Sequence, residues 1–307
     1  MTHISAVIPL LNEEKLVTEL IKRVDSNLSK ISPDYQIILV DDGSTDSTWQ
    51  LIKTESVKNS KISGIKFSRN FGHHYALAAG INQSKSEWVV VMDGDLQDRP
   101  EVIPDLYKKA QEGFDVVFVN RTERKDPVFY LLAQKVFYKI LNLLSGLKFN
   151  SKQANFSIIS KKVVESHRLF GEQARFYGST ILWMGFSRAS IDANHGKRFE
   201  GKPSYTFKKR LKLAYDIIIS FSERPLKLII FFGVAVSILS ILFAVWIAIK
   251  ALLSDFSVLG WPSIIFSIFF TSGLNLIILG LLGIYIGRIF NQVKQRPIYI
   301  IQEEVNL

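Results

Sequence analysis

The sequence predicts an α/β fold with a mostly parallel sheet, followed by a hairpin of two transmembrane helices. Short apolar runs alternate with helical patterns up to about residue 122, and two long stretches near the carboxyl terminus carry no charge. Lys and Arg residues gather beside those stretches. Near-continuous apolar strands separated by helices are typical of a parallel sheet that is covered on both faces.

The apolar runs place the first strands and the helices between them. Strands are expected at Ile4–Pro9, Gln36–Val40, Ile62–Phe67, Trp88–Met92 and Asp115–Asn120. Helices are expected at Glu13–Leu28, Ser47–Lys58, His74–Gln83 and Glu101–Gln111. Residues 123–200 are less periodic, and there we expect a helix at Lys125–Leu144 and short strands at Phe156–Ile159 and Arg188–Ile191.

The uncharged stretches are Leu228–Ile249 and Phe256–Gly287, and each exceeds the roughly 20 residues that cross a bilayer core. From residue 202 to residue 227 there are seven Lys and Arg residues against two acids, and Arg288, Lys294 and Arg296 follow the second stretch. The positive-inside rule therefore places both ends of the hairpin in the cytoplasm. The alternative is a buried hydrophobic subdomain.

The segment Lys208–Ser222 mixes basic and apolar residues, which predicts a helix lying on anionic headgroups. A plain helical linker is the alternative. We therefore expect a cytoplasmic catalytic domain over residues 1–205, a juxtamembrane amphipathic helix over 206–226, two transmembrane helices over 227–290 and a cytoplasmic tail over 291–307.

The amino-acid composition limits the classes of binding partner and of chemistry. The formal net charge of +10 indicates an anionic partner, and because much of this charge lies beside the spans, lipid explains it better than nucleic acid. The chain has no cysteine, which excludes disulfides, Cys-ligated zinc and a cysteine nucleophile. The amino terminus enters a strand pattern at once, so we expect no signal peptide and a cytoplasmic amino-terminal part.

Polar clusters directly follow three of the expected strands, at Asn12–Glu14, Asp41–Asp46 and Asp93–Asp98. Ligands of parallel α/β sheets bind beyond the carboxyl ends of the strands. The carboxylates of Asp93 and Asp95 could hold a hard divalent cation, Mg²⁺ or Mn²⁺, with a diphosphate supplying further oxygens. The three clusters together predict a binding site at this edge.

Each cluster also has a structural interpretation. Asp and Gly are ordinary turn residues, and Asp42, Ser44 or Asp46 could cap the next helix. His73 and His74 stand at a helix start without a second cluster at ligand spacing, so we expect them to be structural rather than metal ligands.

The motifs carry a resemblance. In order along the chain they are Val7-Ile8-Pro9 with Asn12-Glu13-Glu14, Val40-Asp41-Asp42-Gly43-Ser44, Ser68-Arg69-Asn70-Phe71-Gly72-His73, Asp93-Gly94-Asp95-Leu96-Gln97-Asp98, Arg198-Phe199-Glu200-Gly201 with Tyr205, Phe221-Ser222 and Pro225-Leu226. This order resembles the inverting GT-A glycosyltransferases, and more narrowly dolichol-phosphate mannose synthase and its bacterial relatives, the polyprenyl-phosphate glycosyltransferases. The resemblance covers nearly the whole chain.

The resemblance implies a Rossmann-like GT-A sheet and a nucleotide-diphosphate sugar donor, with a UDP-sugar preferred. It implies transfer with inversion to a polyprenyl phosphate such as undecaprenyl phosphate, which gives a lipid-linked sugar for cell-envelope glycan modification. It also implies a multi-pass protein of the inner membrane with a cytoplasmic catalytic domain. Homo-oligomerisation is left open.

By the resemblance, each site residue has an expected role. The nucleotide site would be lined by Pro9, Leu11, Glu13, Val40, Asp42, Asp93 and Gly94. The metal would be held by Asp93, Asp95 and Gln97. Catalysis would depend on Asp95, Arg121 and Arg198, and the acceptor phosphate would be met by Arg198 and Tyr205. Arg suits phosphate because its planar fork grips two oxygens.

The chain departs from the family pattern at three places. Many relatives have an Asp, a candidate base, where this chain has Asn155, and they show Gly-Glu-Ser-Lys-Tyr where it has Gly201–Tyr205. A basic residue near Phe129–Tyr130 is missing. A phosphate monoester has a second pKa near 6 and is largely ionised at neutral pH, so a general base is dispensable.

Other classes fit less well. A processive polysaccharide synthase, with a saccharide acceptor, would show a Gln-x-x-Arg-Trp motif and more spans. A nucleotide-dependent oxidoreductase would show Gly-x-Gly-x-x-Gly after the first strand. A non-catalytic, membrane-anchored module that binds a nucleotide sugar is the remaining alternative, and metal-dependent turnover would exclude it.

Overall fold

The computed structural model describes residues 2–121, 128–150, 152–171, 176–194, 207–253 and 260–307. The chain forms two compact units. We name them the sheet unit, which comprises Met1–Leu143, Leu147–Ile217 and Pro297–Leu307, and the helical unit, which comprises Leu144–Gly146 and Ile218–Arg296.

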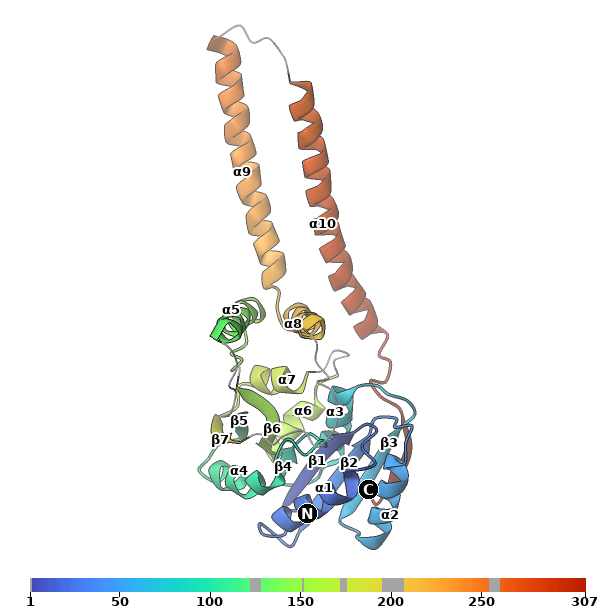
Figure 1. Cartoon of the computed structure of the whole chain (residues 1–307). Coiled ribbons are helices and arrows are strands. Elements are labelled where there is room, and N and C mark those ends of the chain that lie inside the picture. Colours follow the sequence, from blue (N-terminus) through green and yellow to red (C-terminus); the bar gives the residue numbers. More distant parts are fainter. Residues whose placement is uncertain (1, 122–127, 151, 172–175, 195–206, 254–259) are drawn as a thin grey trace. The chain divides into compact units, whose positions relative to one another are not determined.

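The sheet unit is built on an eight-stranded sheet with the order β7-β5-β6-β4-β1-β2-β3-β8 (Figure 1). Its strands are β1 (Ile4–Leu10), β2 (Tyr35–Asp41), β3 (Ile62–Phe67), β4 (Trp88–Val91), β5 (Val116–Arg121), β6 (Gln153–Ser160), β7 (Arg188–Ala193) and β8 (Ile301–Val305). Within this described sheet, β6 and β8 run opposite to the other six strands. The expected mostly parallel sheet is therefore confirmed.

Helices connect the strands of the sheet unit. They are α1 (Val17–Leu28), α2 (Thr48–Lys58), α3 (His73–Gln83), the 3₁₀ helix η1 (Pro100–Val102), α4 (Ile103–Ala110), α5 (Val128–Ser145), α6 (Lys161–Arg168) and α7 (Tyr177–Met184). Each expected helix is found among the described residues, although Lys125 lies outside them, and α1 begins at Val17 rather than at the predicted Glu13.

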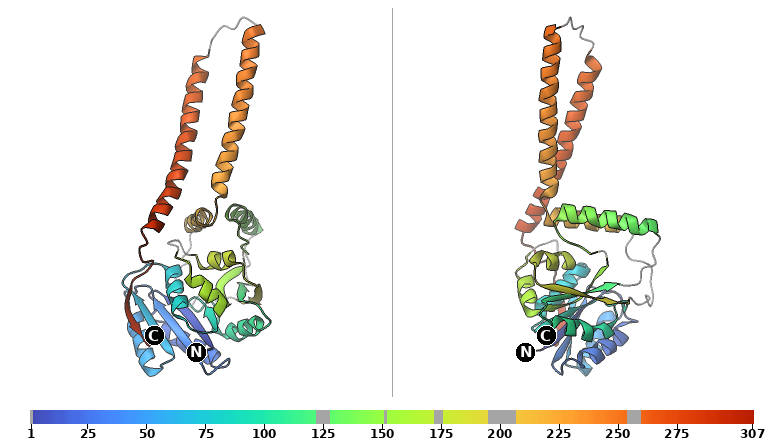
Figure 2. Two further views of the ribbon diagram at one scale, coloured as in Figure 1. Left: turned by 180° about the vertical axis from the view of Figure 1, so that it is seen from behind. Right: turned by 90° about the vertical axis from the view of Figure 1, so that its left-hand side faces the viewer.

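The helices cover both faces of the sheet (Figure 2). Alternate residues of a strand point to opposite faces. Ile4 and Ile8 of β1 belong to the main core cluster together with Leu20 of α1. Val7 points to the other face, where a Cβ built on Gly80 of α3 would lie only 2.3 Å from Val7 Cγ1. Glycine at position 80 therefore lets α3 pack directly on the sheet, and every residue of β1 is buried.

The strand β8 had no counterpart among the predicted elements. The sequence predicts only a tail after the second span, whereas in the structure this segment pairs with β3 in antiparallel register, with Gly64 opposite Val305 and Phe67 opposite Ile301. The chain thus leaves the sheet unit, forms the helical unit and returns to complete the sheet.

The helical unit contains two long helices, α9 (Arg224–Leu253) and α10 (Trp261–Val293), and α8 (Phe207–Phe221) leads into it. By length and composition α9 and α10 are both able to cross a membrane. Among the described residues of their most apolar windows none is buried, which argues against a buried hydrophobic subdomain. Within the unit, the hydroxyl of Tyr285 donates to the carbonyl of Ser222 at 3.1 Å, and Arg288 donates to Ser220 Oγ.

Candidate active site

The three polar clusters meet at one edge of the sheet. The neighbouring strands β4, β1 and β2 are parallel, with Val7 beside Val91 and Leu10 beside Asp41. Their carboxyl ends therefore lie side by side, and the loops that follow them form the candidate site. This is the arrangement that the sequence predicted from the position of the clusters.

The loop after β1 is tied to the loop after β2. Asn12 has a positive φ of 55°, its amide donates to Ser44 Oγ, and its side chain accepts from the amide of Thr45, both at 2.9 Å. The amide of Glu13 donates to Thr48 Oγ1 at 2.9 Å, and that of Glu14 donates to Asp46 Oδ2 at 3.2 Å. These bonds fix the backbone on which the predicted nucleotide residues Leu11 and Glu13 stand.

Asp42 is almost fully buried, at 3% exposure. Its carboxylate accepts from the amide of Phe71 at 2.8 Å and from the amide of Gly72 at 3.1 and 3.0 Å. Burial raises the pKa of Asp42, and the two amides oppose that shift. In this structure Asp42 holds the loop between β3 and α3, and its predicted contact with a nucleotide stays a prediction.

Two glycines permit close approaches at this edge. A Cβ built on Gly43, which has a φ of +75°, would lie 2.4 Å from the backbone carbon of Arg69. A Cβ built on Gly94, between the two acidic residues, would lie 2.4 Å from Leu10 Cδ2 and 3.0 Å from the carbonyl oxygen of Pro9. The turn after β4 therefore packs directly on the end of β1 only because Gly94 lacks a side chain.

His73 belongs to the site. Its Nε2 lies 3.2 Å from Asp93 Oδ1, so the first residue of α3 forms an ion pair with the first carboxylate after β4. Burial opposes the charged form, but Asp93, with the negative charges of Asp42 and Asp95, raises the pKa of His73. Burial alone would raise the pKa of Asp93, whereas His73 and Arg121 lower it.

The expectation that both histidines are structural therefore needs a distinction. Burial, together with the neighbouring charge of His73, lowers the pKa of His74 to about 4. Its Nδ1 accepts from the amide of Tyr177, at 3.5 Å, and its ring packs edge-on against Phe176. His74 is a packing residue, whereas His73 lies at the carboxylates. The sequence signal for this position is that His73 lies in the segment after β3, just as Asp93 lies in the segment after β4, at the same edge of the sheet.

The donor set at the end of β4 fits a hard cation. Asp93 and Asp95 offer carboxylate oxygens, Asp95 Oδ1 accepts from the amide of Gln97 at 3.1 Å, and the side-chain amide of Gln97 could supply a further oxygen. No group of three or more His, Cys, Asp or Glu side chains forms a metal site among the residues that the structure describes. Two carboxylates leave coordination positions for phosphate oxygens.

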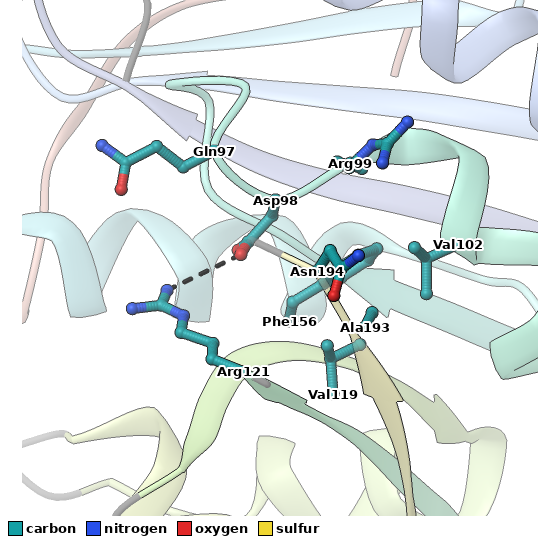
Figure 3. A pocket seen from close by; sticks show the side chains of 9 residues that line it. All are labelled: Gln97, Asp98, Arg99, Val102, Val119, Arg121, Phe156, Ala193 and Asn194. Carbon is teal, nitrogen blue, oxygen red and sulfur yellow. Dashed lines mark ion pairs between the residues drawn. The ribbon is translucent and has the colours of Figure 1, made fainter. Parts of the chain in front are cut away.

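A small pocket next to the carboxylates contains Arg121, at the end of β5. Its Nη2 lies 3.6 Å from Asp98 Oδ1, and the Asp98 side chain is only 3% exposed (Figure 3). Gln97, Phe156 and Asn194 also line this pocket. Burying a carboxylate without a nearby cation costs free energy, and the ion pair with Arg121 offsets this cost for Asp98. Arg121 Nε has no hydrogen-bond acceptor among the described residues and could serve a ligand oxygen.

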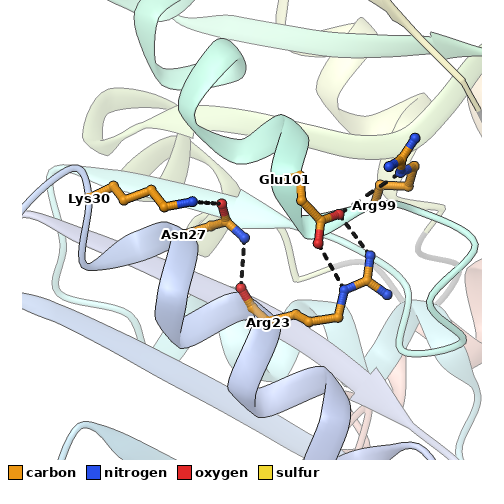
Figure 4. Close-up of polar contacts among 5 residues, drawn as sticks. All are labelled: Arg23, Asn27, Lys30, Arg99 and Glu101. Atoms are coloured by element: carbon orange, nitrogen blue, oxygen red, sulfur yellow. Dashed lines mark hydrogen bonds and ion pairs between the residues drawn. The ribbon is translucent and has the colours of Figure 1, made fainter.

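The loop that carries these acids is anchored to α1 (Figure 4). Arg23 donates from Nε and Nη2 to the two oxygens of Glu101, at 2.9 and 2.7 Å. Arg99 Nε lies 4.0 Å from the same carboxylate. The hydrogen bonds from Arg23 lower the pKa of Glu101. Such a two-pronged contact has a defined geometry, so it fixes the start of η1, two residues after Asp98.

The other predicted site residues lie as follows. Pro9 and Val40 are buried in β1 and β2, and the Val40 side chain faces α3 beside Gly80, so only its backbone is near the strand ends. Leu11 is 40% exposed beyond the end of β1. Asn155 stands near the start of β6, next to the Phe156 of the pocket. Arg198 and Tyr205 lie outside the described residues.

These features define an α/β protein whose sheet gathers carboxylates and cations at the carboxyl ends of its strands, where such folds bind their ligands. Residues 5–168 match the family described as glycosyl transferase family 2. The uncharacterized glycosyltransferase YkcC of Bacillus subtilis is 33% identical over 304 residues, which cover 99% of this chain and 94% of that one. This chain therefore belongs to glycosyl transferase family 2.

Two further similarities add to the comparison. A bactoprenol glucosyl transferase of Shigella phage SfV is 35% identical over 303 residues, which cover 98% of each chain. Among solved structures, glucosyl-3-phosphoglycerate synthase from Mycobacterium tuberculosis, in complex with phosphoglyceric acid, is similar with a TM-score of 0.49 and 18% identity, over 72% of this chain and 79% of that one.

Proposed function

We propose that this glycosyltransferase moves a sugar from a nucleotide diphosphate, with a UDP-sugar preferred, to a polyprenyl phosphate, with inversion at the anomeric carbon. The observation that carries the proposal is the similarity to proteins named bactoprenol glucosyl transferase, which extends over 98% of the chain and thus includes α9 and α10. A lipid-linked sugar made in this way would serve modification of cell-envelope glycans.

In this proposal Asp93, Asp95 and Gln97 hold Mg²⁺ or Mn²⁺. When bound, the ion supplies positive charge to the diphosphate that leaves the sugar. Arg121, held by Asp98 in the pocket, meets phosphate oxygens, and Arg198 and Tyr205 meet the acceptor phosphate. Since that phosphate is largely ionised at neutral pH, the chain has to orient it for in-line attack rather than deprotonate it.

The proposal is tested with purified full-length protein, a panel of nucleotide sugars and undecaprenyl phosphate. Lipid-linked sugar formed from one donor, detected by mass spectrometry and lost in EDTA, is the expected result. A product with a free saccharide acceptor in place of the lipid would contradict the proposed acceptor. Donor binding without turnover on any lipid phosphate would leave a non-catalytic binding module.

We further propose that α9 and α10 cross the inner membrane, with the sheet unit in the cytoplasm and α8 on the anionic surface. Because the chain has no cysteine, single introduced cysteines report without background. Cysteines in Lys108→Cys and Asn291→Cys should react with an impermeant maleimide only from the cytoplasmic side. In Ser257→Cys the opposite side should be reactive, and labelling of all three from one side would exclude the hairpin.

A further inference from the structure

We propose that Tyr299, which lies just before β8, is a positioning residue of the donor site. In this inference, which rests on the proposed function for the identity of the ligand, Tyr299 acts through the loop between β3 and α3. It holds that loop where it binds Asp42 and presents His73 to Asp93. The donor would thus bind to a site whose geometry depends on residues that follow the second apolar helix.

The first link joins Tyr299 and Ile300 to the end of β3. The ring of Tyr299 stacks on Phe67, with ring centroids 5.0 Å apart and planes within 12°. The amide of Ser68 donates to the carbonyl of Ile300 at 3.0 Å, directly beyond the β3–β8 pairing. The last residue of β3 and the first residue of the following loop are therefore both held by Tyr299 and Ile300.

The second link joins this loop to Asp42. Phe67 also packs edge-on against Phe71, with centroids 5.6 Å apart, so one aromatic ring lies between Tyr299 and the loop. The amides of Phe71 and Gly72 are those that bind the buried Asp42 carboxylate. A shift of Phe67 or Phe71 would therefore move the hydrogen-bond donors of a carboxylate at the candidate site.

The third link joins the loop to Asp93, one of the carboxylates proposed to hold the metal. Gly72 has a φ of +118°, which favours glycine, and it precedes His73, whose Nε2 lies 3.2 Å from Asp93 Oδ1. One short loop thus carries the partners of both Asp42 and Asp93. Ring contacts and a hydrogen bond connect this loop to Tyr299 and Ile300. A change at Tyr299 can therefore displace the loop.

The strand β8 itself provides a matched control. Glu303 accepts from Trp49 Nε1 at 3.0 Å and from Lys53 Nζ at 3.3 Å, and both donors belong to α2 rather than to the loop. Beyond β8, Asn306 donates to the carbonyl of Ser56 in α2 and to that of Ile62 at the opposite end of β3. Glu303→Ala therefore weakens the anchoring of β8 but leaves the contacts of Tyr299 in place.

The experiment compares full-length Tyr299→Ala, Tyr299→Phe and Glu303→Ala in detergent. The affinities for UDP and GDP in the presence of Mn²⁺ are measured by calorimetry, and amide exchange in residues 68–73 is followed by mass spectrometry. In Tyr299→Ala we expect faster exchange in the loop and a nucleotide affinity lowered roughly three- to tenfold, the scale of one aromatic pair. Tyr299→Phe should retain both properties, and Glu303→Ala should change neither.

The outcomes separate this inference from the proposed function. Faster loop exchange with unchanged nucleotide affinity, or equal losses of affinity in Tyr299→Ala and Glu303→Ala, would overturn the inference and leave the proposed function intact. If the unmodified protein binds neither UDP nor GDP, the proposed donor site is wrong and the inference about it falls too. In that case loop exchange still decides whether Tyr299 holds the loop.

Discussion

Asp95→Asn is expected to lower turnover by about two to three orders of magnitude, the usual scale for the loss of a key electrostatic group in an active site. The amide keeps the shape of the side chain and can still accept from the amide of Gln97, as Asp95 does at 3.1 Å. It removes one of the two negative charges that would hold the cation. The measurement is lipid-linked sugar formed per minute across a titration of Mn²⁺ and Mg²⁺.

Asp34→Asn is the matched control, because it makes the same substitution in the exposed turn just before β2, at the opposite edge of the sheet. It should leave turnover and metal dependence unchanged. Thermal unfolding of both variants should remain close to that of the unmodified protein. Near-normal turnover in Asp95→Asn, or full activity in EDTA, would remove the metal from the proposed mechanism.

The second large effect is expected at Arg121. Arg121→Ala should lower turnover at least as much as the loss of one donor to a developing charge, roughly a hundredfold. It also leaves Asp98 buried without the cation that lies 3.6 Å away. Arg121→Lys should recover only part of the activity, because an ammonium cannot reproduce a planar fork. Asn155→Ala should cost little, and Arg198→Ala should mainly weaken use of the lipid.

The pH profile distinguishes two roles of Asp98. If the ionised acceptor phosphate attacks unaided, turnover should rise with pH through the second phosphate ionisation near 6 and then stay flat. In Asp98→Asn the rate should fall because Arg121 loses its partner, but the profile should keep this shape. If Asp98 is instead a general base, the substitution should abolish turnover while donor and metal binding persist. A collapse in Asn155→Ala with donor binding intact would also exclude unaided attack.

The sheet could be predicted from the sequence because its inner strands are buried on both faces. The residues of β1 and β4 are apolar almost throughout, and such runs between helices have few other interpretations. The strand β8 could not be predicted in the same way. Its sequence, Ile301–Val305, has two adjacent glutamates and no alternation of apolar and polar residues, so the strand is defined by its partner β3, more than 200 residues earlier.

The position of the site could be predicted, but not its internal pairs. The clusters fall at strand ends, and topology brings strand ends together. That His73 meets Asp93, and that Arg121 meets Asp98, depends on side-chain directions at the ends of α3 and β5, which no spacing encodes. The same holds for Asp42. The sequence predicts its position at the end of β2, but its hydrogen bonds from the amides of Phe71 and Gly72 depend on the path of a loop about 30 residues later.

The return of the chain to the sheet as β8 also orders its biosynthesis. Because β8 follows both long helices along the chain, β3, which pairs with β2 on one side, keeps an open edge until both helices have been made. Open edges invite pairing with other chains. Nascent or truncated forms should therefore be the aggregation-prone ones, and a fusion attached at Leu307 would adjoin the β3–β8 edge. For expression of this protein, an amino-terminal tag is the choice that leaves this edge undisturbed.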